Sequence, residues 1–557
     1  MKNLDNKHYY ILGIWLVVNL IQSIFTGLHS DESYYWMYSE NLAWGFFDHP
    51  PMAAFLIFLG HTLLPGEIGV RILLVLLSTA TLALILNELK EKTDYLFVTV
   101  FVFSFPLIHT HIAGFLAIPD IPLLFFTLLF LIAYKKFLVN SNFKIALLLG
   151  IITALMIYSK YHAFLVIGLT ILSNLKLLRN KYFWLAVVVA LVLLIPHILW
   201  QISNEFPTFK YHLVERTKPF RLKYVFPNLI NQLLMAGPLT GVLIFWKLSK
   251  VKIRDKFQRA MIFNILGFYI LFFLMSFKNR IEAHWSAAIM PMLMLLTYPL
   301  IANDARFKLW FKRLAVPIVF LTILYRIYLA LDIIPNAGYT KITFYNREEH
   351  ALEIKEHANG MKVGFFNNYA AISNYIFYTG DSAVHLSTPT YRFNQYDLWN
   401  DEKYAEGDPL FTVQSKNLEP PNLTRMATGQ MKGFVTIDKF QSLNGLVFQI
   451  EKVTRYEDEF KFKVLLTNNN DHCIYTRHRS NPVLGFMQER KELHFVPLTF
   501  SSKHDEIKPG KTAYLKFTIP ESTINTELPL LVYTRSKNNV RGEIISFHMD
   551  EILNSKK

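Results

Sequence analysis

Long apolar runs dominate the first 330 residues of the chain. A helix that crosses a bilayer needs about 20 mainly apolar residues, and this part of the sequence offers about eleven candidate runs. The stretch 50–64 is apolar but short, and we expect it, together with 32–44, to form helices in the membrane interface within a first outer loop, 29–67. The predicted spans lie near residues 8–28, 68–88, 94–112, 118–138, 143–158, 161–175, 182–202, 225–247, 257–277, 282–302 and 312–331.

The pattern changes after about residue 335. No later run is long enough to span a membrane, and short β-rich segments alternate with turn residues such as those at 468–471 and 509–510. We therefore expect a membrane domain, 1–335, followed by an α/β subdomain, 336–430, and a β-rich, sandwich-like domain, 431–557. The predicted fold class is a mainly α polytopic membrane protein with a C-terminal domain outside the membrane.

Composition supports the membrane assignment. Of the 557 residues, 52% are hydrophobic and 18% are charged, and the mean hydropathy is +0.26. Soluble domains usually carry about 25% charged residues. The formal net charge of +15 could indicate a nucleic-acid partner, but the distribution of the charge gives a different explanation.

Lysine and arginine are concentrated in every second loop. If the N-terminus is cytoplasmic, the inner loops hold 20 of these residues and the outer loops hold 8. This asymmetry is typical of membrane proteins, whose cytoplasmic loops are the more basic ones. An odd number of spans then puts the C-terminal domain outside, which in a bacterium means an inner-membrane protein with a periplasmic domain and no nucleic-acid partner.

Several polar residues fall at the outer ends of the predicted spans. Ionisable groups next to hydrocarbon are costly and point to function. Each also has a structural explanation, since an acidic loop is often merely solvated, Asp120 would cap a helix, Lys160 would reach for the interface, and the basic cluster would be scattered surface charge. The residues are Asp31 and Glu32 after the first span, Asp120 before the fourth, Lys160 and Tyr161 between the fifth and sixth, and Lys278, Arg280 and His284 between the ninth and tenth.

Carboxylates and cations at the outer membrane boundary suit a lipid-linked phosphosugar substrate. The lipid stays in the bilayer, a lysine or arginine stabilises the departing phosphate, and a carboxylate accepts the proton of the acceptor hydroxyl. A nucleotide-sugar donor fits less well, because the sequence has no glycine-rich phosphate-binding loop.

Two stretches carry a resemblance to a known family. The sequence from Asp31 through Trp36, followed by Gly45 to Met52 with the motif Asp48-His49-Pro50-Pro51, resembles the first outer loop of bacterial membrane glycosyltransferases of the dolichyl-phosphate-mannose protein mannosyltransferase type, to which the aminoarabinose transferases are related. The later motifs around Asp120, Lys160 and His284 fall where this family has its own, and the resemblance covers about the first 330 residues.

The resemblance implies a GT-C fold and an inverting transfer of a hexose or pentose from polyprenyl phosphate to a lipid, glycan or protein acceptor. It implies Asp31 as the catalytic carboxylate, with Glu32 and Asp120 as further acids. Substrate-lining positions would be Tyr34, Tyr35, Trp36, Asp48, His49 and Tyr161.

The chain departs from the aminoarabinose transferases at two positions. Tyr34 and His49 stand where those enzymes have arginine and lysine. We therefore expect the donor phosphate to be bound by Lys160, Lys278, Arg280 and His284. Some relatives use a divalent metal ion, for which Asp48 and His49 are the candidate ligands.

Two other functions also fit a polytopic protein. A transporter or flippase of a lipid-linked or small substrate would need ionisable groups or broken helices near mid-membrane, whereas the ionisable residues here lie mostly at span ends. A receptor-like scaffold with a glycan-binding tail would not need eleven spans.

Overall fold

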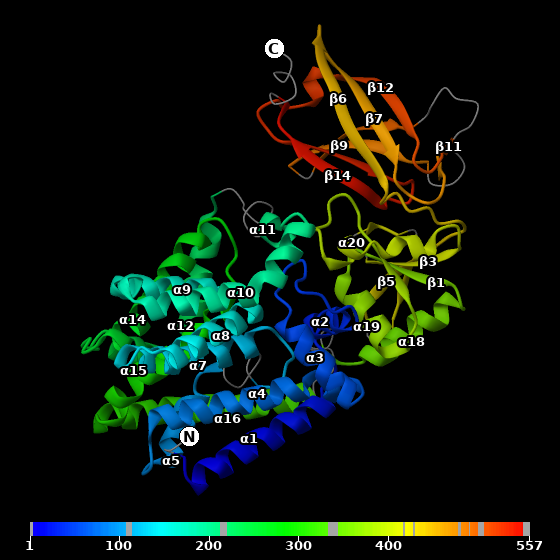
Figure 1. Ribbon diagram of the computed structural model, residues 1–557. Helices are drawn as coiled ribbons and strands as arrows, with labels where there is room; N and C mark the ends of the chain where they lie inside the picture. Colours follow the sequence, from blue (N-terminus) through cyan, green and yellow to red (C-terminus); the bar gives the residue numbers. More distant parts are fainter. Residues whose placement is uncertain are drawn as a thin grey trace. The chain divides into compact units, whose positions relative to one another are not determined.

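The computed structural model divides the chain into two compact units, residues 1–345 and 346–557 (Figure 1). The split falls ten residues after the predicted boundary at 335. The structure describes all residues except 1–3, 107–113, 212–219, 332–343, 416–417, 421, 427–428, 477–480, 490, 499–505 and 550–557. Each unit is treated by itself below.

The first unit is helical. Among the described residues, seven helices are long and apolar enough to cross a membrane. They are α1 (Asn6–Phe25), α4 (Gly66–Leu89), α7 (Asp120–Val139), α10 (Lys181–Ser203), α14 (Lys256–Ser276), the continuous η4 (Ala283–Ile289) and α15 (Met290–Ala302), and α16 (Ala305–Ala330).

Shorter helices account for the remaining predicted spans. The spans near 143–158 and 161–175 correspond to α8 (Phe143–Ser159) and α9 (His162–Ser173), which fall below the length of a full crossing. The predicted span 94–112 begins as α5 (Tyr95–Phe103), and its end lies outside the described residues. The two predicted interfacial helices are α2 (Ser30–Glu40) and α3 (Met52–Leu63).

The predicted span 225–247 is broken. Two helical segments, Leu222–Ala236 and Gly241–Leu248, meet there at an angle of 89°, and together they are long and apolar enough for one bent span. Gly237 lies at the break with φ of +139°, a conformation that residues with a Cβ rarely adopt. A Cβ at this position would also lie 2.0 Å from Thr240 Oγ1.

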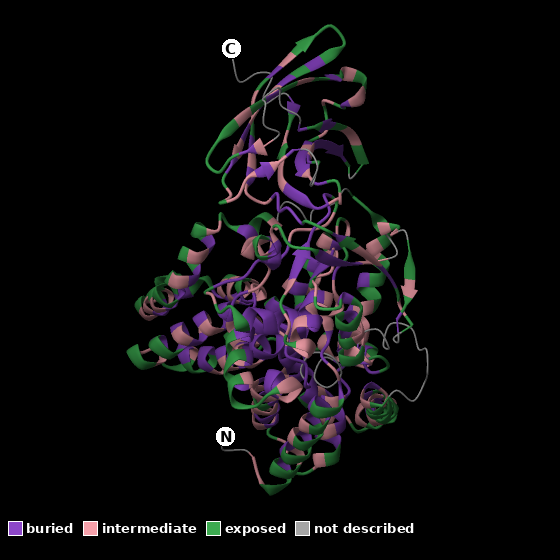
Figure 2. Cartoon of the chain, turned by 90° about the vertical axis from the view of Figure 1, so that its right-hand side faces the viewer, coloured by how far each residue is buried: buried purple, intermediate pink, exposed green. Residues whose placement is uncertain are grey.

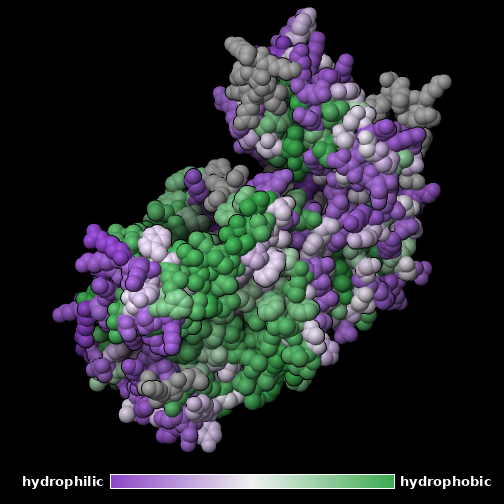
Figure 3. Space-filling view, in the orientation of Figure 1, coloured by the Kyte–Doolittle hydropathy of each residue, from purple (hydrophilic) through white to green (hydrophobic). Residues whose placement is uncertain are grey.

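Hydrogen-bonded caps and close packing define the helical unit. Asp5, Asn142, Asn180, Asp255 and Asp304 cap α1, α8, α10, α14 and α16 through their side chains. Buried residues concentrate inside the unit (Figure 2), and a broad apolar surface covers the face seen in Figure 3. That apolar surface is what a lipid-facing bundle requires.

The second unit begins with a small α/β sheet. Its strand order is β2-β1-β3-β5-β4, with β1 parallel to β2 and β3, and β5 antiparallel to β3. The domain boundary predicted at residue 430 falls inside this sheet, since β5 pairs with β3. The elements are α18 (Arg347–Ala358), β1 (Lys362–Phe366), α19 (Tyr369–Thr379), β2 (Ala383–Leu386), α20 (Gln395–Trp399), η5 (Asp401–Ala405), β3 (Leu410–Ser415), β4 (Leu423–Arg425) and β5 (Met431–Ile437).

Two facing antiparallel sheets complete the unit, which confirms the β-rich C-terminal region. One has the order β10-β9-β13-β14 and the other β12-β7-β6, and residues such as Phe462 and Phe486 pack between them. The strands are β6 (Leu446–Tyr456), β7 (Glu459–Asn468), β9 (Val483–Gln488), β10 (Lys491–Pro497), β12 (Thr512–Pro520), β13 (Leu530–Arg535) and β14 (Arg541–Phe547), beside the short pair β8 (Ile474–Tyr475) and β11 (Glu506–Ile507).

Candidate active site

The acidic pair of the outer loop lies in the first turn of α2. His29 is the N-cap residue, and its Nδ1 accepts a hydrogen bond from the backbone N–H of Asp31. The Asp31 side chain is 44% exposed, with one oxygen 3.9 Å from His29 Nδ1. The neighbouring Glu32 side chain is fully buried. Adjacent carboxylates therefore have opposite environments, one open to solvent and one enclosed.

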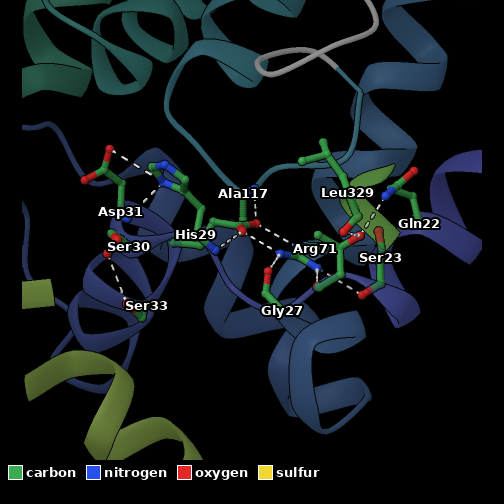
Figure 4. A network of polar contacts seen from close by, with 12 residues as sticks. Gln22, Ser23, Gly27, His29, Ser30, Asp31, Ser33, Arg71, Ala117 and Leu329 are labelled. Carbon is green, nitrogen blue, oxygen red and sulfur yellow. Dashed lines mark hydrogen bonds and ion pairs between the residues drawn. The ribbon is translucent and has the colours of Figure 1, made fainter. Parts of the chain in front are cut away.

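Glu32 is bound by Arg71 from the second turn of α4 (Figure 4). Arg71 Nε donates to Glu32 Oε1 at 2.7 Å, and Nη2 donates to Oε2. The remaining guanidinium hydrogens bind carbonyl oxygens of Ser23, Thr26 and Gly27 at the end of α1. Arginine has five N–H donors, and all five are used here.

The carboxylate of Glu32 is equally saturated. Besides Arg71, it accepts the backbone N–H of His29 at 2.8 Å and of Ala117 at 2.7 Å. Burial by itself would raise the pKa of Glu32, but the Arg71 charge and these hydrogen bonds outweigh it and hold the pKa below its ordinary value. Glu32 therefore stays ionised and ties together α1, α2, α4 and the segment that precedes α7.

A second buried ion pair lies just beyond that segment. Lys160, which follows α8, donates from Nζ to both oxygens of Asp120 at 2.8 Å, and both side chains are almost fully buried. Pro119 is the N-cap of α7 and makes no side-chain cap bond, so Asp120 does not serve as the cap. His162 and His284 lie close enough to act electrostatically on the Asp120 carboxylate.

The double-proline motif forms a third polar group. Asp48 Oδ1 accepts a hydrogen bond from the Tyr38 hydroxyl at 2.8 Å and lies 3.0 Å from His49 Nδ1. On the other side of the imidazole, Nε2 is 3.5 Å from the Tyr35 hydroxyl. The Tyr34 and Tyr38 rings are in contact, with centroids 4.7 Å apart. These tyrosines thus orient the Asp48–His49 pair and do not simply fill space.

Residues of α10 connect this loop to Tyr161. The Tyr161 hydroxyl lies 3.2 Å from His197 Nε2 and accepts a hydrogen bond from Gln201 Nε2 at 2.9 Å. His197 Nδ1 in turn lies 2.6 Å from the carbonyl oxygen of Trp44, and Asp48 acts electrostatically on Tyr161. Tyr161 follows Lys160 in the chain, and its contacts with α10 therefore link Lys160 to the outer loop.

The other predicted residues lie in different settings. Lys278 and Arg280 are exposed beyond the end of α14, and Arg280 Nε is 3.5 Å from Glu282 Oε1. Trp36 is buried on α2, with its indole N–H 3.4 Å from His61 Nδ1. Lys160 is thus the one predicted phosphate ligand that is buried beside a predicted catalytic acid.

The metal hypothesis finds limited support. Within the described residues, no group of three or more His, Cys, Asp and Glu side chains is placed to hold a metal ion. Asp48 and His49 supply two neighbouring ligands, one fewer than the smallest such group.

Sequence reasoning missed Arg71, His197 and Gln201. Arg71 carried a usable signal, because it is the single charge between residues 68 and 87, within a predicted span, and an ionisable residue in such a run needs a partner. His197 and Gln201 had a weaker one, as polar residues four apart on one face of a predicted span.

Comparisons with known proteins bear on the fold of the chain. Residues 48–200 match the family model described as dolichyl-phosphate-mannose-protein mannosyltransferase. The crystal structure of ArnT from Cupriavidus metallidurans in the apo state aligns with a TM-score of 0.55 at 14% identity, covering 77% of this chain and 97% of that one. ArnT from the same organism bound to undecaprenyl phosphate aligns with a TM-score of 0.52 at 14% identity, covering 78% and 98%.

No curated protein sequence matches the chain. The structural likeness, at 14% identity, establishes the fold, and the matched segment contains the Asp48-His49-Pro50-Pro51 motif, Asp120, Lys160 and His197. The chain is therefore a multi-pass membrane protein with the GT-C fold, similar to membrane glycosyltransferases of the protein mannosyltransferase and ArnT type.

Proposed function

We propose that the protein is a membrane glycosyltransferase that moves a sugar from a polyprenyl-phosphate donor to a hydroxyl-bearing acceptor. The arrangement that supports this proposal most directly is the open carboxylate of Asp31 beside the saturated Glu32–Arg71 pair, which is bonded through Ala117 to the segment leading to Asp120 and Lys160. The similarity to ArnT bound to undecaprenyl phosphate supports the lipid carrier.

Asp31 is the proposed general base. As the acceptor oxygen attacks the anomeric carbon, its proton passes to the Asp31 carboxylate. The bond between the anomeric carbon and the phosphate oxygen breaks with its electron pair remaining on the phosphate, so polyprenyl phosphate leaves as an anion. Attack opposite to the leaving group inverts the anomeric configuration.

Lys160 is the proposed first contact of the donor phosphate. Asp120 fixes its ammonium group, and a lysine held in a partly dehydrated site stabilises developing negative charge better than one in water. His284, Lys278 and Arg280 are further candidates for the phosphate. In this scheme Glu32 positions Asp31 and takes no proton, because every hydrogen-bonding site of its carboxylate is occupied.

The predicted topology adds the orientation in the membrane to the proposal. With a cytoplasmic N-terminus, as the loop charges favour, the site and the C-terminal unit face the periplasm of a bacterial inner membrane. The acceptor would then be a glycolipid, glycan or protein of the cell envelope.

A deletion strain tests the proposed function. Mass spectrometry of envelope glycolipids and glycoproteins should reveal a species that lacks one sugar in the deletion strain. Wild-type protein should restore the sugar, and Asp31→Asn produced at the same level should not. Restoration by Asp31→Asn would refute the role of Asp31, and an unchanged sugar content with a lipid trapped on the cytoplasmic side would favour a flippase.

A further inference from the structure

The outer face of the three-stranded sheet β12-β7-β6 carries a row of lysines. Lys463 on the central strand β7 lies directly opposite Lys516 on β12 and Lys452 on β6. Neighbouring strands are about 4.8 Å apart, so three ammonium groups are attached within about 10 Å. Lys461, two residues along β7, adds a fourth on the same face, since Phe462 between them points into the core.

Such a row opposes folding stability. Like charges directly opposite each other on neighbouring strands are destabilising. Glu451 compensates one lysine, with Oε2 at 2.6 Å from Lys463 Nζ. In the part of the chain that the structure describes, no carboxylate lies within ion-pair distance of Lys452 or Lys516. Edge strands often carry lysines that block aggregation, which accounts for Lys452 on β6 and Lys516 on β12 but not for Lys461 and Lys463 on the central strand β7.

The positive charge of the lysine row also contrasts with the balanced net charge of its unit. Residues 346–557 contain 26 Lys and Arg and 26 Asp and Glu, whereas residues 1–345 contain 31 and 16. The lysine row is therefore a local feature of a neutral unit, and the basic excess of the whole protein does not explain it.

Two exposed tyrosines complete this face. Tyr456 on β6 and Tyr514 on β12 are 57% and 52% exposed. Lys461 lies over the Tyr456 ring at 3.8 Å, and Lys463 lies over the Tyr514 ring at 4.3 Å. Each ring thus has an ammonium group over one face, and the exposed tyrosines and lysines together offer aromatic surface and positive charge to an anionic sugar chain.

We infer that this lysine face, defined by Lys452, Lys461, Lys463, Lys516, Tyr456 and Tyr514, binds an acidic polysaccharide whose carboxylates pair with the lysine row. An anionic membrane surface is the less suitable partner, because interfacial binding also needs apolar side chains to insert, and Leu465, the aliphatic residue next to the row on β7, is half-buried. The inference does not depend on the transfer reaction.

The test uses the full-length protein in nanodiscs of zwitterionic lipid, with calorimetric titration of polygalacturonate oligomers and of neutral dextran. Wild-type protein should bind polygalacturonate with an affinity that falls as salt rises. The triple variant Lys452→Gln, Lys463→Gln, Lys516→Gln should bind at least about tenfold more weakly, as expected for three surface charge contacts. Tyr456→Ala with Tyr514→Ala should weaken binding without changing its dependence on salt.

A matched control has the same change in charge on other surfaces of the unit. Lys439→Gln, Lys508→Gln, Lys537→Gln changes three exposed lysines outside the lysine face and should alter affinity by less than about twofold. Equal losses in both triple variants, no binding of polygalacturonate by the wild-type protein, or binding only to vesicles of phosphatidylglycerol would each overturn the inference.

Discussion

Two buried ion pairs at the same end of the helical unit differ in how fully their hydrogen-bonding capacity is used. In Glu32–Arg71, all five guanidinium N–H groups have acceptors and each carboxylate oxygen accepts two bonds. In Asp120–Lys160, the ammonium group donates to Asp120 alone among the described residues, which leaves one of its three N–H donors available.

In our proposal, this difference distinguishes an ion pair that supports the structure from one that takes part in the reaction. A saturated pair has nothing to offer a substrate and holds four segments of backbone in place. In the proposed reaction, the unsaturated Lys160 offers its remaining donor to the phosphate, and the exposed Asp31 offers its carboxylate to the acceptor hydroxyl. Substitutions in the two pairs should therefore differ in whether they mainly reduce stability or activity.

Arg71→Met should be the most damaging change. It leaves the buried Glu32 carboxylate and three carbonyl oxygens without their donor, and breaking a buried ion pair from one side costs about 3–5 kcal/mol. The unfolding temperature in detergent should fall sharply. Arg71→Lys should rescue only part of the loss, because lysine lacks the planar fork, and an unchanged midpoint in Arg71→Met would contradict the structural role of the pair.

Lys160→Gln should affect catalysis more than stability. The remaining Asp120 carboxylate lies at the N-terminus of α7, where the helix dipole favours negative charge, so we expect a loss of about 3 kcal/mol, at the lower end of the cost of breaking a buried ion pair. The KM for the polyprenyl-phosphate donor should rise about tenfold or more. The control Lys136→Gln changes a lysine at the opposite end of α7, and equal effects in both variants would remove Lys160 from the donor site.

Tyr38→Phe should have a smaller effect. The change deletes the hydroxyl that donates to Asp48 at 2.8 Å and leaves the ring, so stability should fall by about 1.5–3 kcal/mol, the range for a hydrogen bond to a charged group. Tyr9→Phe on the exposed side of α1 should change nothing measurable. A Tyr38→Phe variant as stable as the wild type would show that Asp48 finds another donor.

The dependence of stability on pH should be slight near neutrality. The pKa of Glu32 is lower in the folded protein than the ordinary 4.5, so its contribution is fully present above that value and declines as pH falls through the folded pKa. The stability difference between wild type and Glu32→Gln should therefore be constant near neutral pH and shrink in acid. A difference that grows as pH falls would have the wrong sign.

Local sequence signals predicted the membrane unit and several candidate residues. They did not predict the contacts between segments that are distant in the sequence. The apolar runs indicated the membrane unit, and the motif residues Asp31, Asp120 and Lys160 stood out as charges at span ends. Their partners depend on tertiary contacts, since Glu32 meets Arg71 39 residues away and Asp120 meets Lys160 40 residues away. The break at Gly237 was visible as a glycine before proline, but the hydropathy of the flanking residues outweighed it.

The central claim is that Asp31 carries the chemistry while its neighbour Glu32 carries the structure. The most direct test is the initial rate of sugar transfer by purified Asp31→Asn, with the donor identified from the deletion strain, beside Glu40→Gln as an exposed carboxylate of the same helix. We predict a loss of at least about 100-fold for Asp31→Asn, an unchanged unfolding temperature, and a near-normal rate for Glu40→Gln. A near-normal rate for Asp31→Asn would contradict the account.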